Sequence, residues 1–215
     1  MRLASVIAMV AALSLIAADQ ANQTGWSFED AVVGKLPKGW SSGKTGKGAG
    51  SLWKVLEDST APSGTHVLAQ TSSNGPSRLF NLCVCNEATF TDVEITVSFK
   101  AVEGEIDRGG GPVWRYQDEN NYYIARMNPL EDNFRLYKVV DGRRRQLDSS
   151  KVKGAAGKWH KIRIVQKGNH IQCYFNGKLH LDVKDDTFAD KGKVGLWTKA
   201  DAVTSFDELK VHRAK

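Results

Sequence analysis

The chain has 215 residues, and its 30 lysines and arginines against 24 aspartates and glutamates give a formal net charge of +6. The excess is modest, spread along the chain and unaccompanied by a nucleic-acid-binding motif, so nucleic acid is not an expected partner. Two explanations of the positive excess remain open. The basic residues could lie on a solvated sheet exterior, or they could contact an acidic polysaccharide or a membrane surface. The length fits one all-β domain with a complete core.

The chain begins with the pattern of a secretory signal peptide at residues 1–18. Arg2 gives a basic start, residues 3–16 are apolar, and Ala18 is a small residue suited to cleavage. The apolar run is too short for a mature membrane anchor. We therefore expect residues 19–215 to form a single domain, without a transmembrane segment, of a protein exported to the periplasm or the extracellular space.

A low-complexity stretch follows at residues 41–51, SSGKTGKGAGS, and we expect it to be a flexible surface loop. Gly43, Lys44 and Thr45 resemble the end of a phosphate-binding loop. The glycine that such a loop needs five residues earlier is Lys38, which excludes the motif.

Three cysteines are present, Cys83, Cys85 and Cys173. Residues two apart on a strand lie too far apart for a disulfide with each other. In an oxidising compartment Cys173 could pair with either of the other two, or all three thiols could stay free.

Short segments with apolar residues at every second position recur through the rest of the chain, bounded by Gly, Asn, Asp and Pro. Between 170–175 and 178–183, Asn176 and Gly177 indicate a type I′ hairpin turn. The expected strands are residues 92–100, 112–117, 121–128, 134–140, 158–166, 170–175, 178–183, 193–198 and 206–211. About eleven strands in one chain predict an all-β fold, a two-sheet antiparallel β-sandwich of the jelly-roll type.

Residues 103–107 place three carboxylates, Glu103, Glu105 and Asp107, at alternate positions. If extended, they would share one sheet face with neighbours roughly 7 Å apart. The order is similar to the acidic strand of family 16 glycoside hydrolases but scrambled, and the glycines around it favour a loop. Asp107, beside the glycine turn and expected to face Arg115, is the preferred site residue.

Residues 109–140 are the most informative part of the chain, because position parity sorts the residues of their expected strands onto two faces. The expected core face carries Trp114, Tyr116, Tyr123, Ala125, Met127, Phe134 and Leu136. The expected exposed face carries Val113, Arg115, Tyr122, Ile124, Arg126, Arg135 and Tyr137. Arginines offer fixed donors to sugar hydroxyls, a carboxylate or a keto oxygen, and tyrosines can stack on sugar rings. The pattern therefore predicts a carbohydrate ligand.

Motifs along almost the whole of residues 19–215 resemble a known family. They are Phe28-Glu29-Asp30, Gly34-Lys35-Leu36-Pro37-Lys38-Gly39-Trp40, Trp53-Lys54-Val55, Gly157-Lys158-Trp159-His160, Phe175-Asn176-Gly177-Lys178, Lys193-Val194-Gly195-Leu196-Trp197 and Phe206-Asp207. In this order they resemble secreted bacterial concanavalin A-like jelly rolls, closest to those grouped with the 3-keto-disaccharide hydrolases (DUF1080).

The resemblance implies two facing sheets, one of them curved with a glycan on its concave side, and pairing between the first strand and the last. It also implies hydrolysis of a keto-disaccharide. Where the family has a Gly-Asn-Ser-Gly type turn, this chain has Arg108 followed by three glycines, and only Arg115 carries over cleanly.

Three functions stay open: a keto-disaccharide hydrolase, a non-catalytic carbohydrate-binding module, and a laminin G-like interaction domain. The candidate catalytic residues are Asp107, Glu131 and Lys199. The candidate substrate-binding residues are Arg115, Tyr122, Arg126, Arg135, Tyr137 and Trp197. Alternatively, the arginines only pair with Glu131, Asp132 or Glu94. Because Arg126 is expected to be exposed, its replacement by Ala should leave the melting temperature nearly unchanged.

A structural Ca²⁺ is the one expected cofactor. Related sandwiches often hold one where the terminal strands meet, and Glu29, Asp30 and Asp207 supply suitable oxygen donors. The same residues could equally be turn residues at strand ends. The oligomeric state is not indicated by the sequence.

Overall fold

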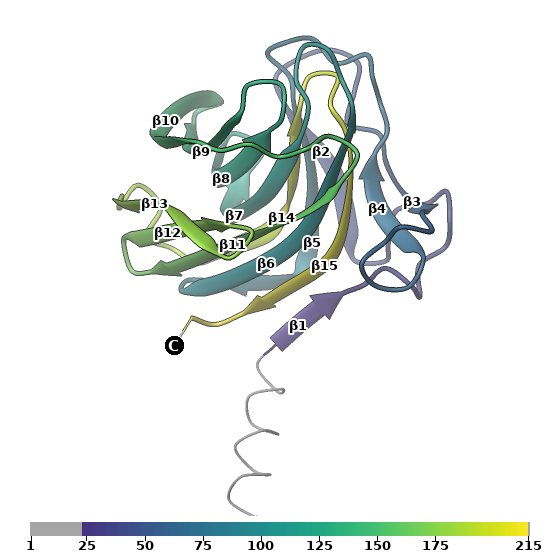
Figure 1. The fold of residues 1–215 in the computed structure, drawn as a ribbon. Coiled ribbons are helices and arrows are strands. Elements are labelled where there is room, and N and C mark those ends of the chain that lie inside the picture. Colours follow the sequence, from purple (N-terminus) through teal and green to yellow (C-terminus); the bar gives the residue numbers. More distant parts are fainter. Residues whose placement is uncertain (1–22, 215) are drawn as a thin grey trace, which may run out of the picture.

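The computed structural model describes residues 23–214. Within them, fifteen strands form two antiparallel sheets packed face to face (Figure 1). This confirms the predicted all-β sandwich. The expected signal peptide lies outside the described residues and stays a prediction. No helix in residues 23–214 has the length and apolar character needed to cross a membrane.

The eight-stranded sheet has the order β13-β12-β11-β6-β15-β4-β3, with β1 paired to β15. Its strands are β1 (Gln23–Trp26), β3 (Trp53–Glu57), β4 (His66–Gln70), β6 (Val93–Glu103), β11 (Trp159–Lys167), β12 (His170–Phe175), β13 (Lys178–Lys184) and β15 (Val203–His212). The pairing of β1 with β15 confirms that the first strand joins the last.

The seven-stranded sheet has the order β10-β9-β8-β7-β14-β5-β2. Its strands are β2 (Trp40–Thr45), β5 (Phe80–Phe90), β7 (Gly110–Asp118), β8 (Asn121–Asn128), β9 (Asn133–Val140), β10 (Arg143–Lys151) and β14 (Gly192–Lys199). The expectation that residues 41–51 form a loop is wrong for the first part of this stretch. Strand β2 pairs with β5, and Thr45 at its end is buried.

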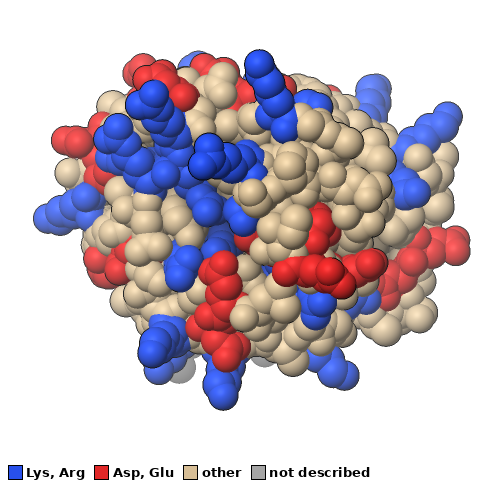
Figure 2. Space-filling view, turned by 90° about the horizontal axis from the view of Figure 1, so that it is seen from above, with Lys and Arg blue, Asp and Glu red and all other residues tan. Residues whose placement is uncertain are grey.

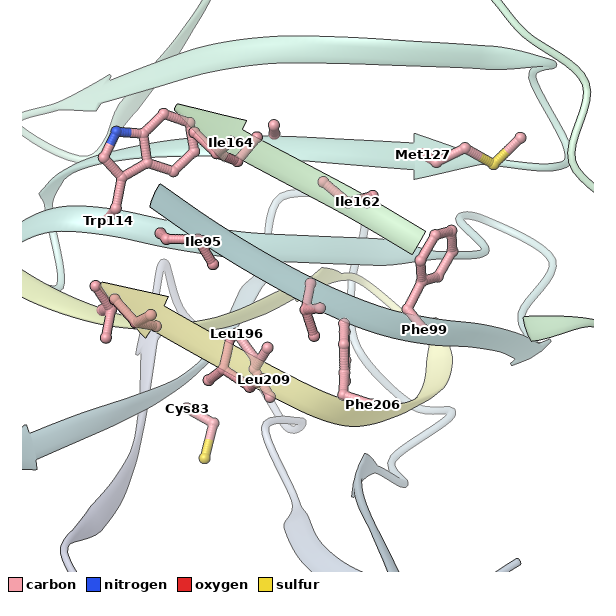
Figure 3. Close-up of a cluster of buried hydrophobic side chains, with 14 of the residues drawn as sticks. Cys83, Ile95, Phe99, Trp114, Met127, Ile162, Ile164, Leu196, Phe206 and Leu209 are labelled. Atoms are coloured by element: carbon pink, nitrogen blue, oxygen red, sulfur yellow. The ribbon is translucent and has the colours of Figure 1, made fainter. Parts of the chain in front are cut away.

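The main core lies between the two sheets. Trp114 and Met127 reach into it from the seven-stranded sheet, and Ile95, Ile162 and Phe206 from the other (Figure 3). Alternation at period two supplies these side chains, since every second residue of a strand faces the partner sheet. The free-energy gain is largest for the aromatic residues, because each buries the most apolar area.

All three cysteines are buried in this core as free thiols. Cys83 and Cys85 lie on β5 of one sheet and Cys173 lies on β12 of the other. The bridge to Cys173 that the sequence left open is not formed. Burial raises the pKa of Cys83, Cys85 and Cys173, so the thiols act as small apolar core residues.

Candidate functional site

The outer face of the seven-stranded sheet is concave, because the sheet curls strongly. Neighbouring strands lie about 4.8 Å apart, so β10 and β5 would be roughly 24 Å apart in a flat sheet. Yet the guanidinium carbon of Arg144 on β10 lies 5.0 Å from the ring centre of Phe80 on β5. The Tyr122 hydroxyl on β8 likewise reaches Thr45 Oγ1 on edge strand β2 at 2.7 Å.

A second apolar cluster fills the floor of this concave face. Its buried members are Phe80, Leu82, Val84, Val113, Tyr122, Ile124, Tyr137, Val139 and Trp197. Val113, Tyr122, Ile124 and Tyr137 are residues that parity assigned to this face, which confirms that part of the prediction. Arg144 covers the floor, with its guanidinium carbon 4.3 Å from the ring centre of Tyr137 and 5.7 Å from that of Trp197.

Next to this floor lies a set of polar side chains that we call the concave cluster. It comprises Asp107, Arg126, Asn128, Glu131, Asn133, Arg135, Tyr137, Arg144 and Lys199. Figure 2 shows this side of the molecule from above, with lysines and arginines gathered on the part where β8, β9 and β10 lie in Figure 1.

The arginine half of the concave cluster is built on β8, β9 and the turn between them. Arg126 donates from Nη1 to Asn133 Oδ1 at 2.9 Å and from Nη2 to Glu131 Oε2 at 2.9 Å. Arg135 donates to the same carboxylate oxygen at 3.1 Å. Arg126 pairs with Arg135 across the two strands, so Glu131 separates two like charges that would otherwise repel each other.

The other half of the cluster joins the β6–β7 loop to the end of β14. Lys199 donates to Asp107 Oδ2 at 3.0 Å, and Asn128 donates to Asp107 Oδ1 at 3.0 Å. The loop is held by Asp201, whose carboxylate accepts the backbone N–H groups of Glu105, Ile106 and Asp107. These hydrogen bonds outweigh burial, so the pKa of Asp201 lies below its usual value.

This loop corrects the sequence-based picture of residues 103–107. Glu103 and Glu105 are exposed, whereas Asp107 is buried, so the three carboxylates do not share one face. Gly104 allows the turn with a φ of 135°, where a side chain would collide with the Asp107 carbonyl. Asp107 contacts Lys199 and not Arg115, contrary to expectation.

Arg115 does not lie on the concave face to which position parity assigned it. It has a φ of 47°, and the pairing register of β7 shifts at this point against both neighbouring strands, β14 and β8. This bulge turns its guanidinium toward the backbone carbonyls of Phe188, Ala189 and Gly168, away from Arg126. The same shift brings Tyr116 to the concave face, where it stacks on Tyr122 with ring centres 5.9 Å apart. The prediction that Tyr116 faces the main core is therefore wrong.

The aromatic residues proposed to stack on sugar do not form an open platform. Tyr122, Tyr137 and Trp197 are each less than 5% exposed. Burial raises the pKa of Tyr122, which hydrogen-bonds to Thr45. Arg126 is also buried, at 1% exposure, so the expectation that this arginine is exposed is wrong.

Charges are strongly coupled inside the concave cluster. Burial alone would raise the pKa of Glu131, but Asn133, Arg126 and Arg135 outweigh it and lower the pKa to about 2. Glu131 is therefore ionised at neutral pH. Burial disfavours charge on Arg126, yet Asp107, Tyr137 and Glu131 raise its pKa above the usual value. Burial lowers the pKa of Arg144.

Arg144 is, with Asn128 and Asn133, a member of the concave cluster that the sequence did not predict. It pairs with Val139 on β9, so it points to the same face as Val139 and Tyr137. The parity that sorted β8 and β9 extends across the hairpin to β10 and could have assigned Arg144. Its neighbours Arg143 and Arg145 lie on the opposite face of the strand and are exposed.

A groove of about 450 Å³ lies elsewhere, on the outer face of the eight-stranded sheet. Arg163 stacks over Tyr174 at 4.7 Å in it and pairs with Glu94. His170 contacts Asp182. These polar groups satisfy one another, so the groove's size does not make it the stronger candidate site.

The expected calcium ligands come together only in part. Asp207 is buried and accepts the backbone N–H groups of Ser63 and Glu208. Glu29 accepts the N–H groups of Thr65 and His66, and Asp30 is exposed. Burial raises the pKa of Asp207 and outweighs the backbone hydrogen bonds from Glu208 and Ser63, and the charges of Glu208 and Glu29 raise it further. In residues 23–214 no group of three His, Cys, Asp or Glu side chains suited to a metal is found, so calcium here stays a prediction.

Residues 27–212 match the model of the 3-keto-alpha-glucoside-1,2-lyase-like domain. The chain belongs to this family. No curated protein matches its sequence.

Solved structures share the fold at low sequence identity. The carbohydrate-binding module CBM66 from Bacillus subtilis is 18% identical, covers 80% of this chain and 94% of its own, and has a TM-score of 0.63. The Bacillus licheniformis β-glucanase is 13% identical, with coverages of 89% and 98% and a TM-score of 0.61. A third structure is domain 4 of AbnA, a GH43 extracellular arabinanase from Geobacillus stearothermophilus, in complex with arabinotriose. It is 12% identical, with coverages of 88% and 91% and a TM-score of 0.58. The sandwich is thus shared with both a binding module and an enzyme, and fold alone does not choose between them.

Proposed function

We propose that this chain is an exported glycan-binding domain whose ligand contacts the concave cluster of the seven-stranded sheet. The observation that carries the proposal is the arrangement of Arg126, Arg135, Arg144 and Lys199 around one small area, each held by neighbouring side chains. Fixed guanidinium donors bind sugar oxygens with little further loss of side-chain entropy. Export is supported by the signal-peptide pattern at residues 1–18.

The exposed rim of the cluster favours a ligand at this place. Ile106 is 52% exposed and Leu130 is 48% exposed, and their loops meet where Asn128 donates to Asp107. Apolar side chains around a polar centre can contact the C–H faces of a sugar while the centre binds its oxygens.

The test is isothermal titration of residues 19–215 with a panel of oligosaccharides, neutral and acidic. We expect Arg135→Gln to weaken binding of the best glycan by about tenfold, which corresponds to one hydrogen bond from a charged donor. Arg163→Gln, in the groove of the other sheet, is the matched control and should bind as the wild type does. Loss only in Arg163→Gln would move the site to the other face, and equal losses in the two variants would show nonspecific charge attraction.

Hydrolysis of a keto-disaccharide is the second candidate, and the Asp107–Lys199 pair is the observation that favours it. A buried carboxylate in contact with an ammonium group offers an acid and a base at the edge of the cluster. Glu131, with a pKa of about 2, stays ionised and cannot donate a proton at neutral pH. Of the three predicted catalytic residues, Asp107 and Lys199 are therefore the better candidates.

Product analysis by mass spectrometry tests this second candidate. Purified protein is incubated with common disaccharides and their 3-keto forms, with and without EDTA. Release of a keto-sugar and a free monosaccharide, abolished in Lys199→Met, would establish an enzyme. Absence of products in the presence of measurable binding would leave a binding module.

A further inference from the structure

Most of the hydrogen-bond acceptors in the concave cluster are already occupied. Asp107 accepts from Asn128 and Lys199, one at each carboxylate oxygen. Glu131 Oε2 accepts from Arg126, Arg135 and Asn133 at 2.9, 3.1 and 2.9 Å. A ligand that enters the cluster therefore meets few free acceptors.

Donors, in contrast, are left over. Among residues 23–214, Arg126 Nε and Arg144 Nη1 are buried nitrogen atoms without a hydrogen-bond partner. The Arg126 side chain is 1% exposed, whereas the Arg144 side chain is partly exposed and within reach of a ligand. An unpaired buried donor destabilises the folded protein, and an acceptor brought by a ligand to Arg144 would offset that cost.

The charges of the concave cluster also favour a ligand that brings acceptors. Four cationic side chains, Arg126, Arg135, Arg144 and Lys199, lie around two carboxylates, Asp107 and Glu131. Arg144 and Arg126 repel each other, and burial lowers the pKa of Arg144 further. The cluster thus carries an excess of positive charge beside spare donors, and a bound anion would relieve both the repulsion and the unmet hydrogen bonds.

We propose that the ligand is an acidic glycan, a uronic-acid-containing oligosaccharide whose carboxylate is bound by Arg144, the partly exposed guanidinium over the floor. This inference rests on the proposed glycan-binding function of the same face. A carboxylate brings acceptors and no donor, which matches what the cluster lacks, and a guanidinium binds it in a fixed two-point geometry. A neutral sugar would bring as many hydroxyl donors as acceptors to a place with few acceptors free.

The test compares each acidic glycan with its own carboxyl-reduced form, which keeps the linkage and removes the charge. Isothermal titration at about 0.15 M NaCl limits long-range charge attraction. Polygalacturonate, alginate and hyaluronan oligosaccharides are the probes. We expect at least one acidic form to bind about tenfold more tightly than its reduced form, the effect of one charged hydrogen bond.

Variants of β10 supply a matched comparison. Arg144→Gln and Arg145→Gln remove the same charge from adjacent positions, one on each face of the strand. We expect Arg144→Gln to remove the preference for the acidic form and Arg145→Gln to keep it. Arg144→Lys should also lose most of it, because an ammonium group keeps the charge but lacks the planar fork.

The outcomes separate this inference from the function on which it rests. If the acidic and reduced forms bind equally well and Arg144→Gln weakens both, the proposal of an acidic ligand is overturned and the proposed glycan binding is kept. Equal losses in Arg144→Gln and Arg145→Gln would show nonspecific charge attraction and also overturn it. Failure of the whole panel, neutral and acidic, would overturn the proposed function itself.

Discussion

Arg115 shows how one backbone angle redirects a side chain. In a regular strand it would share a face with Val113, but its φ of 47° interrupts the alternation. Its guanidinium instead lies at 1% exposure, where it donates to three backbone carbonyls and lies 3.7 Å from Asp92. Carbonyl groups of a loop need such donors when they are buried.

We expect Arg115→Met to lower the free energy of unfolding by about 2–3 kcal/mol, because charged hydrogen bonds to buried carbonyls are lost. Glycan binding should not change. Urea unfolding measures the first quantity and titration the second. Arg163→Met, which removes a more exposed arginine, should cost less than about 1 kcal/mol. Stability unchanged together with lost binding would return Arg115 to the site.

At the scale of elements, the loop between β13 and β14 closes the gap between the two sheets beside β7. Asp185 receives hydrogen bonds from Lys138 at 2.7 Å and from the Tyr123 hydroxyl at 2.6 Å. Arg115 holds the same loop at Phe188 and Ala189. Burial opposes the Asp185 charge, but Lys138, Thr187 and Tyr123 outweigh it and lower the pKa to about 2.

This lowered pKa predicts a pH dependence of stability. An unfolded aspartate has a pKa of about 3.9, so the stabilisation by Asp185 is complete above that value and is lost as the pH falls toward about 2. At pH 7, Asp185→Asn should lower the free energy of unfolding by about 1 kcal/mol, allowing for solvent screening. The gap to wild type should narrow when urea unfolding is repeated at about pH 3.

Asp186→Asn is the control for this prediction, because Asp186 is an exposed neighbour of the same charge. It should unfold like the wild type at both pH values. A gap for Asp185→Asn that widens on acidification would contradict the assignment of Asp185 as a stabilising ionised group.

At the scale of the whole molecule, the segment after β1, the loop before β4 and strand β15 meet at Glu29 and Asp207. Both carboxylates are bound by backbone N–H groups of the same loop. The adjacent residues Phe28 and Glu208 have φ angles of 64° and 48°, which are costly for residues other than glycine. A cation at this junction would offset the repulsion between the carboxylates.

We expect Ca²⁺ to raise the melting temperature of the wild type, because a ligand that binds only the folded state stabilises it by about 2.7 kcal/mol at a hundredfold excess over Kd. Asp207→Asn should abolish the rise, and EDTA should reverse it. Mg²⁺, which prefers a smaller octahedral site, is the control ion. Identical melting curves with Ca²⁺ and with EDTA would exclude a calcium site in this state of the protein.

Several features of the fold were accessible from the sequence for a simple physical reason. Strand periodicity is local, so Val93, Ile95, Val97 and Phe99 could be assigned to the core without knowing their partners. The same holds for Tyr122 and Tyr123, which lie on opposite faces as parity requires. The bulge at Arg115 could not be foreseen, since an arginine carries no signal for a positive φ.

The sequence by itself determined the all-β class, the two-sheet sandwich and the face of nearly every residue on β8 and β9, because each depends on neighbours along the chain. Only the tertiary structure decided which residues of these faces are accessible to solvent. Curling of the seven-stranded sheet buries Tyr122 and Trp197, brings Arg144 over Phe80 and joins Asp107 to Lys199. These contacts join strands far apart in the sheet, and their closeness depends on sheet curvature, which no local pattern encodes.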